Sequence, residues 1–239
     1  MTDISAVIFD KDGTLFDFQK TWGGWAAAAL DTLAGGDRAL ADRLARAMRY
    51  DPVAQRFAPD SLVIAGTTGE VAHLLQPLLP HFGVDQLADE LNRLSCDAPQ
   101  TPAVDLPACL GGLRARGLPL GLVTNDSEAG ARAHLHGAGV AGLFDFIAGY
   151  DSGYGAKPEP GQLLAFAHAV GIAPARIAMV GDSLHDLAAA RAAGMRAVGV
   201  LTGPATQSVL APAADVVLTD IGGLPGWLDS GARVFRKPA

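Results

Sequence analysis

Two aspartates separated by a single residue follow the first apolar run of the chain. Asp10 and Asp12 come directly after residues 4–9 and lead into Gly13 and Thr14. The short run with β-branched residues predicts a buried strand, and the glycine predicts a turn after it. A carboxylate at such a strand end is a competent nucleophile toward phosphorus, and a second carboxyl group can protonate the leaving group. The same residues are also common turn formers, so alone they favour both interpretations about equally.

A second pair of aspartates follows another apolar run. Residues 177–180 predict a strand, and the chain continues as Gly-Asp-Ser-Leu-His-Asp, which places Asp182 and Asp186 just after it. Asp182 is a hard oxygen ligand of the kind that Mg²⁺ takes in proteins. Asp182 or Ser183 also fits the N-cap of the helix that follows. The two interpretations are compatible, with Ser183 as the cap and Asp182 as the metal ligand.

Two further positions become candidate site residues when they are considered together with these aspartates. Thr124 and Asn125 follow a predicted strand at 118–123. Their hydroxyl and amide groups, with the backbone N–H groups of the next helix, can hold phosphate oxygens; such residues are equally common as helix caps. Lys157 precedes a predicted helix, and an isolated lysine is usually a solvated surface charge.

The elements that must position these residues alternate between strand and helix. Strands are predicted at 4–9, 118–123, 144–148, 177–180, 197–200 and 215–218, and helices at 106–116, 128–136, 161–170 and 184–193. This alternation predicts an α/β fold with a doubly wound, mainly parallel, Rossmann-like sheet. In such sheets ligands bind beyond the carboxyl ends of the strands, which is where the polar residues above lie.

A helical stretch interrupts this pattern after the first strand. Segments 21–33, 38–48, 70–79 and 86–95 have helical spacing, and no convincing strand separates them apart from the ambiguous 62–65. We therefore expect an α/β core domain of residues 1–16 and 97–239 and an inserted helical cap domain of residues 17–96.

Composition narrows the classes of function. The chain has 239 residues and a net charge of −7, which argues against a general nucleic-acid binder because that function needs a basic surface. Its two cysteines stand apart and offer neither a disulfide framework nor a zinc site. No apolar run is long enough for a membrane span. We therefore expect a cytoplasmic protein that binds neither nucleic acid nor a membrane.

Taken together, the four motifs resemble the haloacid dehalogenase superfamily, and its phosphatase branch in particular. Its signature is DxDGT at the first strand, Ser or Thr after the second, then Lys, then GDxxxD after the fourth. Here these are residues 10–14, Thr124, Lys157 and residues 181–186, in that order. The resemblance covers essentially the whole chain, and the layout is similar to phosphoglycolate phosphatase-like enzymes, including the Lys11 between the two acids. It implies a small phosphorylated metabolite as the substrate, and we expect a monomer or homodimer.

The resemblance implies a role for each matched residue. Asp10 would attack the phosphorus, and Asp12 would protonate the leaving alcohol and then deprotonate the water that cleaves the aspartyl-phosphate. Mg²⁺ would be held by Asp10, by the backbone carbonyl of Asp12 and by Asp182. Thr124 and Lys157 would grip the phosphoryl oxygens. Contacts to the substrate are also expected from Gly13, Thr14 and Asn125, and Asp186 is expected to orient Lys157 or support the metal ligands.

The cap is expected to be mobile and to contact the far end of the substrate. Candidate contacts are Arg46, Arg49, Arg56, Thr67 and Thr68, although each is more often a surface arginine or a loop threonine. Trp22 and Trp25 could line the substrate side of the cap, but aromatic residues at helical spacing more often form its core.

Several alternatives stay open at this point. Asp12 argues against a hydrolytic dehalogenase, whose halide leaving group needs no proton. A sugar-phosphate mutase shares all four motifs. A phosphonate hydrolase would need a cap lysine, for which Lys20 is the single candidate in residues 17–96. The alternative from a different class is a non-catalytic protein that binds metal or phosphate.

Overall fold

The computed structural model describes residues 4–231, and its centre is a six-stranded parallel sheet. The strand order is β5-β4-β1-β6-β7-β8, and every neighbouring pair is parallel. The strands are β1 Ala6–Phe9, β4 Leu120–Val123, β5 Phe146–Ala148, β6 Ile177–Gly181, β7 Arg196–Val200 and β8 Val216–Leu218. The predicted fold class is confirmed, and each predicted strand is present with its ends moved by a few residues.

Helices cover both faces of the sheet because its strands are apolar on both sides. The helices of this core are α5 Leu106–Ala115, α6 Glu128–Gly137, α7 Gly161–Val170, α8 Leu184–Ala192, α9 Gln207–Leu210 and α10 Leu224–Asp229, with 3-10 turns at Ala141–Leu143, Pro174–Arg176 and Ile221–Gly223. In β1, Val7 and Phe9 pack with α5, α6 and α10, whereas Ala6 and Ile8 pack with α7 and α8.

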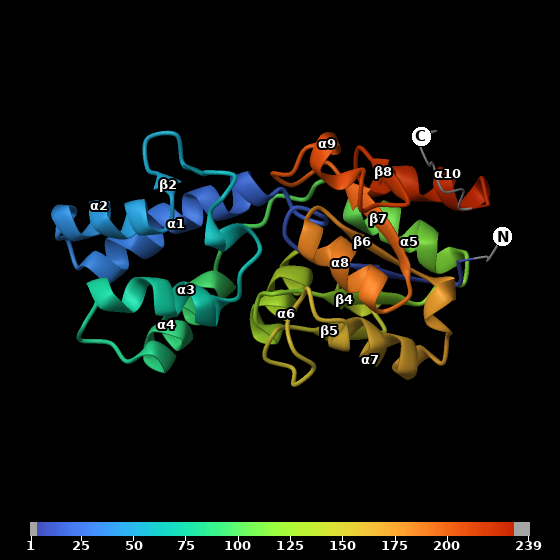
Figure 1. The fold of residues 1–239 in the computed structure, drawn as a ribbon, viewed down its shortest axis with the longest axis horizontal. Coiled ribbons are helices and arrows are strands. Elements are labelled where there is room, and N and C mark those ends of the chain that lie inside the picture. The colour runs from blue at the N-terminus through green and yellow to red at the C-terminus, as the bar shows by residue number, and fades with distance from the viewer. Residues whose placement is uncertain (1–3, 232–239) are drawn as a thin grey trace.

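The chain between β1 and α5 forms a helical cap with its own apolar cluster (Figure 1). Its helices are α1 Phe18–Ala34, α2 Arg38–Ala47, α3 Thr68–Leu75 and α4 Val84–Cys96, with 3-10 turns at Leu62–Ile64 and Gln76–Leu78. Asp17 is the N-cap of α1, and its side chain accepts from Lys20 N. The division at residues 16/17 and 96/97 stays a proposal.

One part of the cap was predicted wrongly. Tyr50–Asp51 and Arg56–Phe57 form a two-stranded antiparallel hairpin, β2 and β3, in a region where no convincing strand was expected. The ambiguous segment 62–65 holds a 3-10 turn instead of a strand. In the described part of the chain, no helix is long and apolar enough to cross a membrane.

Candidate active site

The predicted site residues meet because the strands that carry them are neighbours. Asp10 follows β1, Thr124 follows β4 and Asp182 follows β6, and β1 lies between the other two. After β1 the chain forms β4 and β5 on one side of β1, and it then crosses to form β6, β7 and β8 on the other side. The strand order therefore reverses at β1. A crevice opens at such a point beyond the strand ends.

A buried lysine ties two of the aspartates together. Lys157 Nζ donates to Asp10 Oδ1 at 2.5 Å, to Asp186 Oδ1 at 2.6 Å and to the Val123 carbonyl at 3.1 Å. Asn125 fixes the loop that carries this lysine, since its side chain accepts from Lys157 N and donates to Lys157 O, both at 2.9 Å. The lysine is therefore a buried counter-ion rather than a solvated surface charge.

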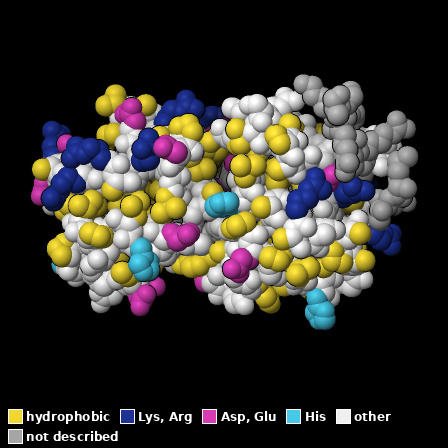
Figure 2. Space-filling model, in the orientation of Figure 1, with side chains coloured by type: hydrophobic (Ala, Val, Ile, Leu, Met, Phe, Trp, Pro, Cys, Tyr) yellow, Lys and Arg dark blue, Asp and Glu magenta, His cyan; other side chains and the backbone are white. Residues whose placement is uncertain are grey.

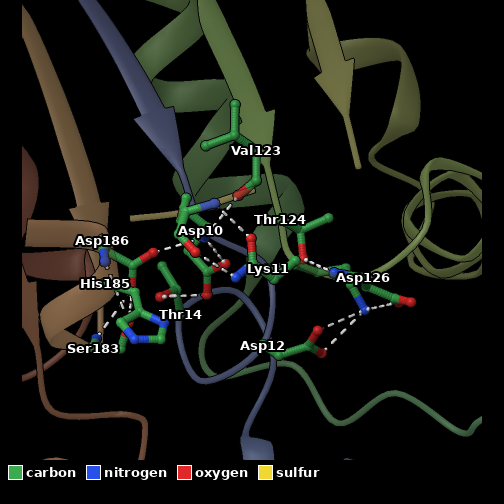
Figure 3. A network of polar contacts seen from close by, with 12 residues as sticks. Asp10, Lys11, Asp12, Thr14, Val123, Thr124, Asp126, Ser183, His185 and Asp186 are labelled. Atoms are coloured by element: carbon green, nitrogen blue, oxygen red, sulfur yellow. Dashed lines mark hydrogen bonds and ion pairs between the residues drawn. The ribbon is translucent and has the colours of Figure 1, made fainter. Parts of the chain in front are cut away.

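Asp186 is oriented by the start of its own helix. Ser183 is the N-cap of α8, as expected from the sequence, and its backbone N–H and hydroxyl donate to Asp186 Oδ2 at 3.0 and 2.6 Å. One carboxylate oxygen of Asp186 is thus used by the capping box with Ser183 (Figure 3), and the other accepts from Lys157.

Three buried carboxylates lie close enough to share a cation. Oxygen atoms of Asp10, Asp182 and Asp186 are all within 4.8 Å of one another. Asp182 is packed against Gly13 and Gly203, where an added Cβ would come within 2.4 and 1.7 Å of its Oδ2. Gly13 also has φ +83°, which favours glycine. Both oxygens of Asp186 have close hydrogen-bond partners, whereas Asp10 Oδ2 has only a long contact of 3.5 Å with Thr14. Asp10 Oδ2 and Asp182 are therefore the oxygen donors best placed for a hard cation, and such donors fit Mg²⁺.

Burial shapes the protonation of this cluster. Desolvation raises the pKa of Asp10 to about 7, with Lys157 opposing the shift and Asp186 adding to it. Burial, with the neighbouring Asp10 and Asp186, also raises the pKa of Asp182 well above its ordinary value. For Lys157 burial lowers the pKa, but Asp10 and Asp186 outweigh it and raise the pKa overall. A divalent cation would relieve the repulsion that these shifts report.

The residues expected to bind phosphate oxygens differ in how many of their polar atoms already have hydrogen-bond partners. The Thr124 hydroxyl accepts from Asp126 N at 3.1 Å, which leaves its own proton for another acceptor. The Thr14 hydroxyl lies 3.5 Å from Asp10 Oδ2. The Asn125 side-chain amide is occupied by backbone groups of Lys157 and Ala65. Their roles in binding substrate stay predictions.

Asp12 belongs to a second buried cluster, centred on Lys11 (Figure 3). Lys11 Nζ lies 2.9 Å from Asp12 Oδ2, 2.9 Å from Asp126 Oδ2 and 2.8 Å from His134 Nδ1. The Trp22 indole N–H of the cap donates to Asp12 Oδ1 at 2.8 Å. Burial lowers the pKa of Lys11, but Asp12 and Asp126 outweigh it and raise the pKa overall.

The same cluster joins the core to the cap. An ammonium group only donates, so His134 Nδ1 is an acceptor and its Nε2–H donates to the Ser95 carbonyl of α4 at 2.8 Å. Burial and Lys11 lower the pKa of His134, which is consistent with this neutral form. The sequence interpretation left Lys11 without a role; the signal was a lysine between two acids at a buried strand end.

Replacing Lys11 by methionine should lower the free energy of unfolding by about 3–5 kcal/mol, because it leaves buried carboxylates without their counter-ion. Urea unfolding would measure this. The double variant Lys11→Met/Asp126→Asn should recover part of the loss. Lys20→Met is the control, since Lys20 is exposed and forms a surface pair with Asp17 at the start of its own helix. It should change stability by less than about 0.5 kcal/mol. Equal effects of Lys11→Met and Lys20→Met would contradict the structural role of the cluster.

Both clusters border one pocket between core and cap, with an empty volume of about 730 Å³ including its open mouth. Of the cap residues singled out in the sequence, Trp22, Trp25 and Thr68 line it, whereas Arg46, Arg49, Arg56 and Thr67 do not. His185 also lines it, and its Nδ1 lies 3.3 Å from the Ala65 carbonyl.

Comparisons with known proteins agree with this geometry. A family model described as haloacid dehalogenase-like hydrolase matches residues 4–194. A phosphoglycolate phosphatase from Rhodospirillum rubrum is 35% identical over 98% of this chain and 96% of its own, and one from Escherichia coli is 32% identical over 84% and 82%. A crystal structure described as a predicted phosphoglycolate phosphatase from Haemophilus somnus has a TM-score of 0.72 and 18% identity, covering 95% of this chain and 98% of its own.

Proposed function

The chain belongs to the family of haloacid dehalogenase-like hydrolases, and on this premise we propose that it hydrolyses small phosphate monoesters with Mg²⁺ through an aspartyl-phosphate. Its relatives over nearly the whole chain are phosphatases, and the chain is a phosphatase. The observation that carries the finer proposal is the buried Asp10, fixed by Lys157 at the carboxyl end of β1 beside Asp182.

The proposed reaction has two steps. An Asp10 oxygen forms a bond to phosphorus while the bond from phosphorus to the ester oxygen breaks, and Asp12 gives that oxygen a proton. Water then attacks the phosphorus of phosphorylated Asp10 and loses a proton to Asp12, which releases phosphate and restores both carboxyl groups. Lys157 and Thr124 hold the phosphoryl oxygens through both steps.

Mg²⁺ would be held by Asp10, Asp182 and the Asp12 carbonyl, and it would offset the charge on the transferring phosphoryl group. Lys157 alone cannot offset the negative charge of the phosphate and of the three clustered aspartates Asp10, Asp182 and Asp186. This imbalance supports the need for a divalent cation.

Phosphate release from a panel of small phosphomonoesters, with Mg²⁺ or with EDTA, tests the proposal. Phosphoglycolate belongs in this panel because the relatives' names give it as their substrate. Release that needs the metal is the expected result. Absence of release across the panel would contradict the proposed hydrolysis. The cytoplasmic location and the oligomeric state stay predictions.

Binding of Mg²⁺ should depend on pH, since the metal competes with protons for raised carboxyl groups. Without metal, folded Asp10 keeps its proton up to about pH 7, whereas the unfolded chain releases it near 3.8. The unfolded chain therefore holds fewer protons between these values, so the stability of the metal-free protein falls as pH rises through this window. We expect Mg²⁺ to raise the melting temperature more at about pH 8 than at about pH 5.5.

Asp182→Asn is the matched variant for this measurement. It removes one proposed ligand at nearly constant volume and should lose most of the stabilisation by Mg²⁺ at the higher pH. If Mg²⁺ raised the melting temperature of that variant as much as that of the wild type, Asp182 would not be a metal ligand. If the rise in the wild type did not depend on pH, competition between the metal and protons would be contradicted.

A further inference from the structure

The half of the pocket that faces the cap is built mainly from apolar side chains, with Thr68, Ser95 and the Trp25 Nε1–H, for which the described residues offer no hydrogen-bond partner, as its polar groups. Phe18, Trp22, Trp25, Val71 and Leu91 line it, and none of them is more than 9% exposed. The rings of Trp22 and Trp25 meet edge to face with centroids 5.0 Å apart. On the molecular face drawn in Figure 2, hydrophobic side chains also border both sides of the line between cap and core. This half of the pocket favours an apolar group in contact with it.

The lysine and arginine charge of the described pocket lining is confined to the end at Asp10, where the substrate phosphate is proposed to bind. Among residues 4–231, Lys157 is the only lysine or arginine in the pocket lining, and its Nζ is bound to Asp10 and Asp186. His185 is the other lining group that can carry positive charge, and its Nδ1 faces the Ala65 carbonyl at 3.3 Å.

Negative charge in the lining is abundant by comparison. Five carboxyl groups border the pocket: Asp10, Asp12, Asp126, Asp182 and Asp186. Lys11 pairs with Asp12 and Asp126, while Lys157 and the proposed divalent metal face Asp10, Asp182, Asp186 and one phosphate, so no positive charge in the described part of the site is left over for a second anionic group. A carboxylate on the leaving group would enter a site with no further lysine or arginine in the described lining, and it would lose its hydration against apolar walls.

We propose that the preferred substrates are phosphate monoesters of uncharged alcohols with an apolar, ring-sized body, and that esters whose leaving group carries a carboxylate, phosphoglycolate among them, are poor substrates. This inference rests on the proposed phosphatase function and specifies its leaving group. Burial of apolar surface against the aromatic wall favours the first class, and the unpaired negative charge disfavours the second.

A matched pair of esters separates charge from size. Benzyl phosphate and 4-carboxybenzyl phosphate have nearly the same body and differ in one carboxylate. With Mg²⁺ present, we expect kcat/KM for benzyl phosphate to exceed that for the carboxylated ester by about tenfold or more, and to exceed that for phosphoglycolate as well.

Placing a cation in the lining should weaken this preference. Thr68 lines the pocket and is half-buried, so Thr68→Lys brings an ammonium group to the cap side with little disturbance of the apolar cluster. This variant should lower the benzyl to carboxybenzyl ratio by about tenfold. Leu74→Lys is the control, because Leu74 is exposed on the same helix α3 and does not line the pocket; it should leave the ratio within about twofold.

The possible results distinguish the inferred leaving-group preference from the proposed phosphatase function on which it rests. Metal-dependent hydrolysis in which the carboxylated ester or phosphoglycolate equals or exceeds benzyl phosphate would overturn the inference and leave the phosphatase function standing. A ratio that Thr68→Lys and Leu74→Lys change equally would contradict the assignment to charge in the pocket. Absence of hydrolysis of every ester would overturn the proposed function and the inference with it.

Discussion

Replacing Asp10 by asparagine should reduce magnesium-dependent phosphate release by about 10⁴-fold or more. The amide keeps the shape of the carboxylate, and its oxygen can still accept from Lys157, which now lies 2.5 Å from Asp10 Oδ1. Its oxygen is a far weaker nucleophile than a carboxylate, so the covalent step is lost while the pocket is kept. Steady-state phosphate release, measured with the best ester of the panel, gives the factor.

A buried aspartate elsewhere provides the control for this substitution. Asp215 is 4% exposed, precedes β8 at the opposite end of the strands, and accepts from Ala197 N and Arg191 Nη1 at 2.9 Å. Asp215→Asn should therefore cost stability and change kcat by no more than about threefold. Turnover of Asp10→Asn at the wild-type rate would contradict the nucleophile. Ligand-dependent stabilisation without turnover in the wild type would instead favour a non-catalytic binding protein.

The sequence predicted this site well because its residues follow strands of one parallel sheet. An apolar run that ends in a polar residue locates a strand end, and parallel strands bring such ends to the same edge. That was enough to expect Asp10, Thr124 and Asp182 near one another. The order β4-β1-β6, which makes them immediate neighbours, is confirmed by the structure and was not itself derived from the sequence.

The Lys11 cluster could not be predicted in the same way. His134 lies 123 residues from Lys11 in the sequence, on the helix after β4, and meets it only because α6 packs beside α4 of the cap. Trp22 has the spacing of a cap-core residue and does pack in the cap cluster, yet its N–H reaches Asp12 in the core. Such contacts depend on how the cap sits on the sheet, and local periodicity carries no information about that.

The hairpin in the cap was missed for a related reason. Each of its strands is only two residues long, too short to show an alternation of apolar and polar residues. Tertiary contacts stabilise it: the Tyr50 hydroxyl donates to the Gly23 carbonyl at 2.6 Å, and Gln19 both donates to and accepts from the backbone of Phe57. At Gly23 a Cβ would lie 2.1 Å from the Gln55 carbonyl oxygen, so glycine is needed in α1 to admit the hairpin.

Replacing Asp12 by asparagine should slow the second step of the reaction more than the first. Both Asp12 oxygens accept from N–H donors, Lys11 and Trp22, and these contacts stabilise the carboxylate that is left once Asp12 has protonated the leaving group. A base is what the hydrolysis of phosphorylated Asp10 requires. Loss of this group should lower kcat by about 10²–10⁴-fold and make the phosphorylated enzyme accumulate.

The nature of the leaving group separates the two roles of Asp12. 4-Nitrophenolate leaves without a proton, so with 4-nitrophenyl phosphate the variant should give a rapid burst of one nitrophenolate per enzyme and then a slow steady state. With an alkyl ester the burst itself should be slow, because the alkoxide has lost its proton donor. Intact-protein mass spectrometry should find one added phosphoryl group in the variant.

Asp126→Asn is the matched control, since Asp126 shares Lys11 with Asp12 at the same 2.9 Å but stands on a different strand end from Asp10. If disturbance of the Lys11 cluster alone slowed the enzyme, both variants would accumulate the phosphorylated form; if Asp12 is the base, only Asp12→Asn does. A burst in neither variant, with wild-type turnover in Asp12→Asn, would contradict the acid–base role. The buried lysine would then serve to anchor the cap through Trp22 and His134, and the proton would have to be taken by another group in the pocket.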